Sequence, residues 1–205
     1  MATPTTRRRA RRKNNWVRVV VAVAVIAVVA IALVVGFGGS SGKKNTPAAG
    51  TTGATKAAST LLSKALTEMT SGNLTQAQSD LRQVLTLDPK NKYAFYNLGY
   101  IAQTQGNKTD AESEYNLALA VDPKYDPALY NLAILRTADN NANGAIVLYR
   151  QAIASNPKDA NAHFNLGLLL RKAGETGQGN SEVQAAVKLN PALAAAAQAQ
   201  GVPAQ

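Results

Sequence analysis

Side chains able to perform catalysis or to bind metal ions are scarce in this chain of 205 residues. It has no cysteine and one histidine, His163. Without thiols the chain has no disulfide, no thiolate zinc site and no cysteine nucleophile. A single imidazole leaves a transition-metal site short of ligands. We therefore predict that the protein binds no metal or other cofactor, and that His163 is a packing residue with a partly buried ring.

Carboxylates are the remaining candidates for acid chemistry. They are scattered singly or lie on the outer faces of predicted helices, as Asp110, Glu112 and Glu114 do. Acid catalysis or a cation site would need such groups to converge. A solvated helix face with acidic residues near its N-terminus explains these three more simply. Because the chain also lacks a glycine-rich phosphate loop, we predict that the protein is not an enzyme.

The elements that position these residues follow a repeat of 34 residues. Four pairs of an acid or amide with proline recur at this interval: Asp88-Pro89, Asp122-Pro123, Asn156-Pro157 and Asn190-Pro191. A constant period between 20 and 50 residues is typical of a solenoid. Placing the proline at unit position 32 gives a repeat domain over residues 58–193. Its units are 58–91, 92–125, 126–159 and 160–193.

Each unit has the pattern of two helices that cross closely. Small residues recur at unit positions 8 and 20, where they allow close packing of helices. They are Ala65, Gly99, Ala133 and Gly167 at position 8, and Ala77, Ala111, Ala145 and Gly179 at position 20. Turn residues separate the two helices, and the proline follows the second helix, which it cannot continue. The sequence therefore predicts an all-α fold of about four helix-turn-helix units.

The second unit carries this pattern most fully, in Leu98-Gly99, Ala111, Tyr115, Ala118 and Pro123. In these residues and in its length the repeat resembles the tetratricopeptide repeat (TPR). The resemblance implies a TPR α-solenoid over about two thirds of the chain. It also implies that the solenoid binds a protein or peptide partner along its concave face.

The resemblance is weaker at the two ends of the domain. Unit one has Lys64 where the others have leucine, and unit four has Gly177 and Gly179 where its second helix should begin. Terminal units of a stack are often atypical because one side faces water. Residues 191–205 are predicted to form a C-terminal capping helix, with proline in its first turn, followed by a short tail.

In TPR folds the first helix of each unit lines a groove, and the resemblance assigns unit positions 2, 5, 6, 9 and 12 to it. The predicted peptide-binding residues are Tyr93, Tyr96, Asn97, Tyr100, Tyr130, Asn131, Ile134, Asn161, Asn165, Leu168 and Arg171. The recurring Asn amides both donate and accept hydrogen bonds, which suits the backbone of an extended peptide. Tyrosine offers rigid contact area with a polar tip. The alternative is that these Tyr and Asn residues pack between units.

One subgroup of the family binds acidic chaperone tails through basic residues at groove positions 5 and 2 of successive units. The present chain has Leu62 and Pro127 at those positions. A carboxylate clamp of that kind is therefore not expected.

The N-terminal region has the pattern of a membrane anchor. Val19–Phe37 contains no charged residue over 19 positions, and a helix of that length spans about 28 Å of a hydrocarbon core of ~30 Å. Trp16 stands where an interfacial aromatic residue belongs. We predict a basic cytoplasmic tail over residues 1–15, a transmembrane signal-anchor helix over 16–37 and a flexible linker over 38–57 that is rich in Gly, Ser and Thr.

The charge distribution sets the expected orientation in the cell membrane. Of the net charge of +10, residues 1–18 contribute seven basic and no acidic side chains, whereas residues 58–205 hold 12 basic and 12 acidic ones. The positive-inside rule predicts a single-pass protein with a cytoplasmic N-terminus and an extracytoplasmic repeat domain. The basic tail is expected to face anionic lipid and to bind no specific nucleic acid.

Two alternatives remain open from the sequence. In one, the hydrophobic run is a cleaved signal peptide, and the repeat domain is a secreted soluble binding module. In the other, the arginine-rich tail makes the protein an adaptor that recruits acidic partners in the cytoplasm.

Overall fold

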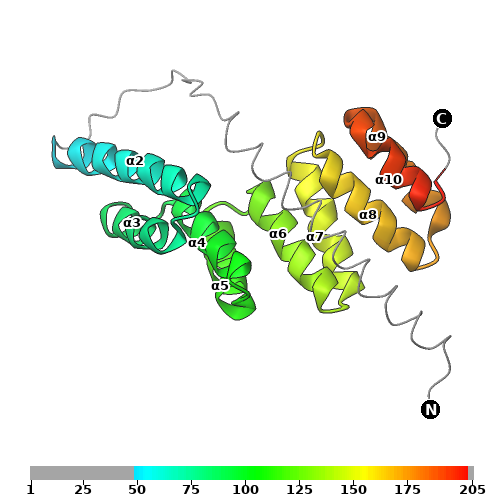
Figure 1. Ribbon diagram of the computed structural model, residues 1–205, viewed down its shortest axis with the longest axis horizontal. Coiled ribbons are helices and arrows are strands. Elements are labelled where there is room, and N and C mark those ends of the chain that lie inside the picture. Colours follow the sequence, from blue (N-terminus) through cyan, green and yellow to red (C-terminus); the bar gives the residue numbers. More distant parts are fainter. Residues whose placement is uncertain (1–48, 203–205) are drawn as a thin grey trace, which may run out of the picture. The chain divides into compact units, whose positions relative to one another are not determined.

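The computed structural model describes residues 49–202, and this part of the chain is entirely helical (Figure 1). The helices are α2 (Ala49–Thr70), α3 (Leu74–Leu87), α4 (Lys92–Thr104), α5 (Lys108–Val121), α6 (Asp126–Ala138), α7 (Ala142–Ser155), α8 (Ala160–Lys172), α9 (Thr176–Leu189), the 3-10 turn η1 (Pro191–Leu193) and α10 (Ala194–Ala199). The predicted tail 1–15 and transmembrane helix 16–37 lie outside the described residues. Among the helices within 49–202, none is long and apolar enough to cross a bilayer.

The predicted repeat is confirmed by the helix boundaries. The second helices α3, α5, α7 and α9 begin at Leu74, Lys108, Ala142 and Thr176, each one period of 34 residues after the last. The turn before each contains a residue of positive φ, which is glycine at 72, 106 and 174 and asparagine at 140. This left-handed conformation favours Gly and tolerates Asn, because a larger or branched side chain would clash with the backbone.

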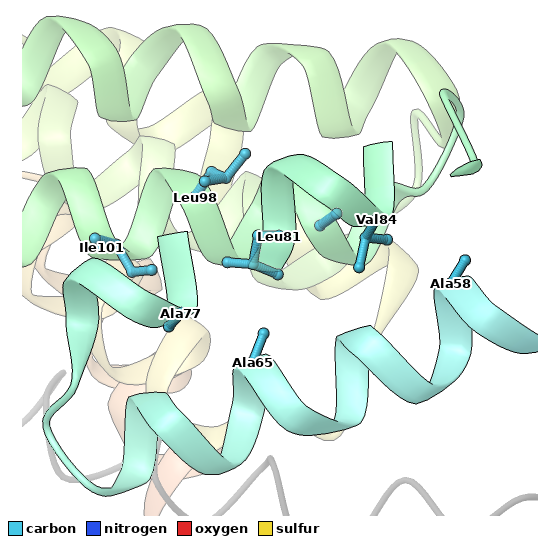
Figure 2. Close-up of a cluster of buried hydrophobic side chains, with 8 residues drawn as sticks. Ala58, Ala65, Ala77, Leu81, Val84, Leu98 and Ile101 are labelled. Atoms are coloured by element: carbon cyan, nitrogen blue, oxygen red, sulfur yellow. The ribbon is translucent and has the colours of Figure 1, made fainter. Parts of the chain in front are cut away.

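Small residues bring the two helices of each unit into contact, as predicted. A Cβ atom on Gly99 would lie 2.7 Å from ring atoms of Tyr115, and one on Gly167 would lie 2.6 Å from the backbone oxygen of Gly179. In unit one, Ala65 of α2 and Ala77 of α3 are fully buried (Figure 2). Helix α9 forms despite the glycines in its first turns, and Gly179 is one of the residues that the close crossing requires.

Each unit stacks on the one before it through three apolar positions of its first helix. In α4 these positions hold Ala94, Leu98 and Ile101, which join a core cluster with Leu81 and Val84 of α3 (Figure 2). Positions 3, 7 and 10 of α6 and α8 hold Ala and Leu in the same way, and all of these side chains are buried. Continuous burial from unit to unit is what stabilises a solenoid.

The first helix of unit one has polar side chains at the same three positions. They are Thr60, Lys64 and Thr67, all exposed to solvent. The two threonine hydroxyls donate to carbonyl oxygens of their own helix. The Lys64 ammonium lies 3.0 Å from a carboxylate oxygen of buried Asp80, an ion pair without hydrogen-bond geometry. The polar residue at position 64 is therefore explained, because within residues 49–202 this face of α2 is exposed to solvent.

The C-terminal cap is a shortened first helix. Helix α10 begins at Ala194, one period after Ala160 at the start of α8, and ends before Gly201, whose φ is +72°. Leu193, Ala197 and Val202 are buried in one core cluster with residues of α8 and α9. The predicted cap is thus confirmed up to residue 202.

The predicted linker was wrong at its C-terminal end. Helix α2 begins at Ala49, so residues 49–57 are helical and not part of a flexible connection. Good helix formers such as Ala54, Lys56 and Ala57 extend the helix beyond the first buried residue, Ala58. The Gly and Thr content of the segment concealed this extension.

The close crossing in unit four yields a matched pair of substitutions. Gly167→Ala should lower the free energy of unfolding by about 1–3 kcal/mol, since the new methyl group meets the backbone of α9. Gly177→Ala should leave stability unchanged or raise it by about 0.5 kcal/mol, because no atom lies within 4 Å of its added Cβ. Urea unfolding followed by circular dichroism measures both. Equal effects of the two substitutions would contradict the account of the crossing.

Candidate functional site

The predicted binding residues all lie on first helices. We call unit positions 2, 5, 6, 9 and 12 of α2, α4, α6 and α8 the first-helix stripe, since these positions share one helical face. Helix α4 carries Tyr93, Tyr96, Asn97 and Tyr100; α6 carries Tyr130, Asn131 and Ile134; and α8 carries Asn161, Asn165, Leu168 and Arg171.

Solvent reaches the stripe unevenly. In α6, Tyr130, Asn131 and Ile134 are buried, with 6%, 3% and 5% of their surface exposed, and Leu168 of α8 is buried as well. Among the eleven predicted residues only Tyr93, at 42%, counts as exposed. The α6 part of the stripe is therefore packing surface, and α4 holds its most accessible aromatic ring.

The asparagine side chains are engaged inside the domain. Asn131 Nδ2 donates to the Tyr96 hydroxyl at 3.2 Å, and Asn165 Nδ2 donates to the Tyr130 hydroxyl at 3.0 Å. Each bond joins a first helix to the first helix of the preceding unit. Asn97 Nδ2 instead donates to the carbonyl oxygen of Tyr93 at 2.7 Å. The asparagine amides expected to pair with a peptide backbone are thus used inside the domain. Two of them link neighbouring units, and the third bonds to the backbone of its own helix.

Burial keeps the tyrosine partners of these bonds neutral. It raises the pKa of the Tyr96 and Tyr130 hydroxyls well above the ordinary value. Both hydroxyls therefore retain their protons at physiological pH and accept the amide bonds as neutral groups.

A cluster of aromatic rings lies at the start of α4. The rings of Tyr93 and Tyr96 each meet the ring of Tyr125 edge to face, with centroids 5.8 and 5.5 Å apart. The Lys92 ammonium lies 5.3 Å from the Tyr93 centroid and 5.0 Å from that of Tyr125, and it pairs with Asp122 at 2.6 Å. These contacts fix the Tyr93 ring, because edge-to-face and cation–π contacts are both favourable.

Sequence reasoning missed Tyr125 and Lys92 because neither occupies a stripe position. Tyr125 stands at the N-terminal cap of α6, where α4 and α8 have Asn91 and Asp159 that accept backbone hydrogen bonds. Tyr125 makes no such side-chain bond. An aromatic residue in place of a capping residue was the signal available in the sequence.

Arg171 holds the C-terminal cap in place. Its guanidinium donates to the carbonyl oxygen of Gln200 at 2.8 Å and to the side chain of Asn180. The predicted charged member of the binding surface therefore already joins α8 to α9 and to the segment after α10.

His163 is a packing residue, as predicted. Its side chain is 14% exposed, with Nδ1 2.6 Å from a carboxylate oxygen of Glu182 and Nε2 3.1 Å from the carbonyl oxygen of Pro157. Within residues 49–202 no three side chains of the metal-binding types converge.

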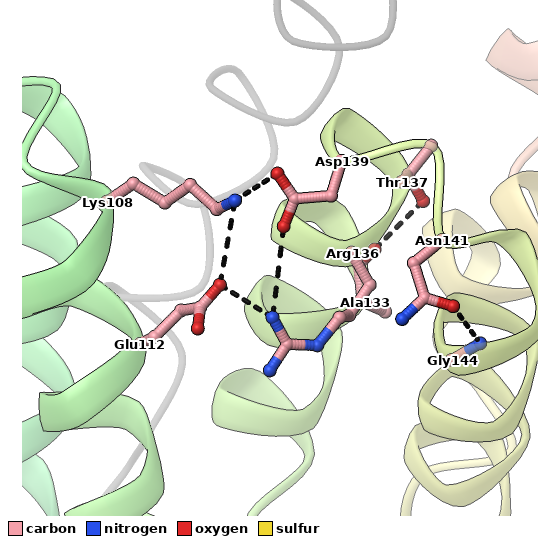
Figure 3. A network of polar contacts seen from close by, with 8 residues as sticks. All are labelled: Lys108, Glu112, Ala133, Arg136, Thr137, Asp139, Asn141 and Gly144. Carbon is pink, nitrogen blue, oxygen red and sulfur yellow. Dashed lines mark hydrogen bonds and ion pairs between the residues drawn. The ribbon is translucent and has the colours of Figure 1, made fainter.

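The three carboxylates of α5 differ in environment. Asp110 is exposed. The Glu112 carboxylate accepts a hydrogen bond from the Arg136 guanidinium at 2.6 Å and lies 3.8 Å from the Lys108 ammonium. Together with Asp139 these residues form a four-residue ion-pair network that joins α5 to α6 (Figure 3). The prediction of a solvated face is wrong for Glu114, because its Oε2 atom is buried without a hydrogen-bond partner. Burial raises the pKa of Glu114, an effect that Arg82 opposes.

The raised pKa of Glu114 makes stability depend on pH. The folded protein holds this proton more tightly than the unfolded chain does, so the free energy of unfolding falls as pH rises from the ordinary carboxyl range through the raised value. Glu114→Gln should therefore be more stable than the wild type at neutral pH, with a difference that shrinks in acid. Urea unfolding across pH measures this, with exposed Glu175→Gln as control. A variant that is less stable at neutral pH would contradict the assignment.

Comparison with known proteins gives the same architecture. One family model, described as tetratricopeptide repeat, matches residues 62–126, and another, described as TPR repeat, matches residues 135–174. Together the matches cover about half of the chain. No curated protein matches the sequence.

Three solved structures illustrate the likeness. PilF of Pseudomonas aeruginosa is 25% identical, with a TM-score of 0.62 over 68% of this chain and 64% of PilF, so the match spans slightly less than two thirds of that protein. PilW, described as a widely conserved type IV pilus biogenesis factor, is 21% identical (TM-score 0.61, 70% of each chain). YrrB, described as a TPR protein with an unusual peptide-binding site, is 20% identical (TM-score 0.58, 70% of this chain and 76% of YrrB).

The last two likenesses concern the fold alone, whereas the family models match the repeats themselves. With the period, the helix pairs and the small residues at their crossings, they show that this chain belongs to the tetratricopeptide repeat family.

Proposed function

We propose that this protein is a membrane-tethered scaffold that binds a protein or peptide partner along the first-helix stripe. The observation that carries the proposal is the exposed ring of Tyr93 on α4, held in place by Tyr125 and Lys92. A rigid, partly exposed aromatic side chain on a solenoid is the kind of residue that contributes most to a protein interface. TPR proteins bind proteins or peptides, and YrrB is described as having a peptide-binding site.

The proposed role is binding and not catalysis. The one imidazole of the chain, His163, contacts Glu182 and Pro157 within the domain. Glu112 is paired with Arg136 between helices, and the unpartnered oxygen of Glu114 is buried. These groups are engaged or enclosed, so they support the architecture of a scaffold.

The proposed tether rests on residues outside the described part of the chain. The uncharged run Val19–Phe37 matches the thickness of a bilayer, and seven basic residues lie within 1–18. We place the tail in the cytoplasm and the repeat domain outside the cell membrane, where the partner belongs to an envelope-associated assembly. The secreted module and the cytoplasmic adaptor are the alternatives to be tested.

Site-specific photo-crosslinking in intact cells tests tether and surface together. A photo-reactive phenylalanine analogue replaces Tyr93 on α4 in one full-length variant and Val147 on α7, which is 53% exposed, in the other. The analogue at 93 should form a defined adduct in the membrane fraction, and protease added outside the cell membrane should degrade it. The variant at 147 should form far less of the same adduct.

Three results would contradict the proposal. Equal amounts of the adduct from both positions would show that the first-helix stripe is not the binding surface. A shortened chain in the medium would identify the secreted module. Protection of the repeat domain from external protease would place it in the cytoplasm.

A further inference from the structure

The accessible half of the first-helix stripe has a distinct chemical character. On α4, Tyr93, Tyr96 and Tyr100 are spaced i, i+3, i+7 and so share one helical face. The adjoining stripe positions of α2 are Ser59, Leu62, Ser63, Leu66 and Met69. None of the stripe positions on these two helices carries a charge. The surface offered to a partner is therefore aromatic and apolar with hydroxyl groups.

The hydrogen-bonding groups expected to read a peptide backbone are largely in use. Asn97 Nδ2 is bonded to the carbonyl oxygen of Tyr93, and the Tyr96 hydroxyl accepts from Asn131. The ring of Tyr93 is 42% exposed despite its contacts with Tyr125 and Lys92, and the ring of Tyr100 is partly exposed. Recognition must then depend on packing against aromatic rings more than on an amide ladder.

The spacing of the tyrosines fits one peptide conformation. Positions i and i+7 of an α-helix are about 10.5 Å apart along its axis. One turn of polyproline II is three residues and about 9.3 Å. An extended ligand lying along α4 would thus present every third side chain to Tyr93 and then to Tyr100. Proline-rich segments bind aromatic surfaces in this way, because their conformation is formed before binding.

The charges beside Tyr93 disfavour an acidic peptide as the ligand. Lys92 is the cation beside Tyr93, and its ammonium already pairs with Asp122 at 2.6 Å and lies over two aromatic rings. A carboxylate-bearing peptide would have to compete for it with an adjacent aspartate. An uncharged ligand meets no such cost.

We infer that the partner segment is uncharged and proline-rich, with prolines three residues apart, and that it packs in polyproline II conformation on Tyr93 and Tyr100. This inference rests on the proposed function of the stripe and specifies the ligand class. It assigns Tyr93 and Tyr100 as contact residues and Tyr125 and Lys92 as residues that position Tyr93.

Fluorescence anisotropy with the full-length chain in detergent micelles tests the inference. The first probe is a labelled, end-capped dodecapeptide of Pro, Ala, Ser and Gln with proline at every third position. The second has the same composition without prolines three apart, and the third is an acidic peptide with a free carboxyl terminus. The first should bind at least about tenfold more tightly than either of the others.

Variants connect this binding to the tyrosine rings. Tyr93→Ala and Tyr100→Ala should each weaken binding of the first peptide about fivefold or more, whereas Tyr93→Phe, which keeps the ring, and Val147→Ala on α7 should retain it. Circular dichroism melting shows whether each variant stays folded. If Tyr100→Ala unfolds, Tyr100→Leu repeats the test at position 100, because leucine removes the aromatic ring but keeps an apolar side chain of similar reach.

The outcomes separate the inference from the proposed function. Equal binding of the first two peptides, tighter binding of the acidic one, or no effect of Tyr93→Ala would overturn the inference. If crosslinking from position 93 still captures a partner in cells, the stripe remains a binding surface with a different ligand. If neither peptide binding nor crosslinking occurs at position 93, both proposals fail.

Discussion

The stacking of one helix pair on the next is the constraint on which the rest of this structure depends. Apolar side chains at three positions of α4, α6 and α8 are buried where each helix packs on the preceding unit, and an amide–hydroxyl bond links successive first helices in two places. Stacking removes Tyr130, Asn131 and Ile134 from solvent. It leaves the ring of Tyr93 accessible. The same contacts that build the solenoid therefore decide which part of its first-helix stripe is free to bind.

At the two ends of the domain, where stacking stops, the residues at the stacking positions differ. Helix α2 has Thr60, Lys64 and Thr67 where α4 has apolar residues, and these three side chains are exposed to solvent. At the other end the short helix α10 covers α9, and Arg171 holds the segment that follows it. Within the described residues, polar groups thus replace the apolar stacking positions at one end of the domain, and a cap covers them at the other.

Much of this fold could be predicted because it is periodic. The helix pairs, the turns at glycine or asparagine, the close crossings at Gly99 and Gly167 and the C-terminal cap all recur at one interval and depend on local residue type. The candidate site was predictable only as a stripe of positions. Whether Asn131 faces a ligand or Tyr96 depends on a contact between residues 35 apart, which helical periodicity does not determine. Tyr125, the burial of Glu114 and the bond from Arg171 to Gln200 depend on similar contacts between elements.

Asn131 and Asn165 of the stripe join neighbouring units through tyrosine hydroxyls, and we propose that the tyrosines of α4 are left to contact the partner. A double-mutant cycle on Tyr130→Phe and Asn165→Ala, measured by urea unfolding, is the most direct test of this division of roles. The hydrogen bond between the two side chains should give a coupling of about 0.5–1.5 kcal/mol between the two substitutions. Tyr130→Phe with Asn161→Ala, on the same helix as Asn165, should be additive to within about 0.5 kcal/mol. A coupling near zero for Tyr130 and Asn165 would contradict the account, because the amide would then be free to bind a ligand.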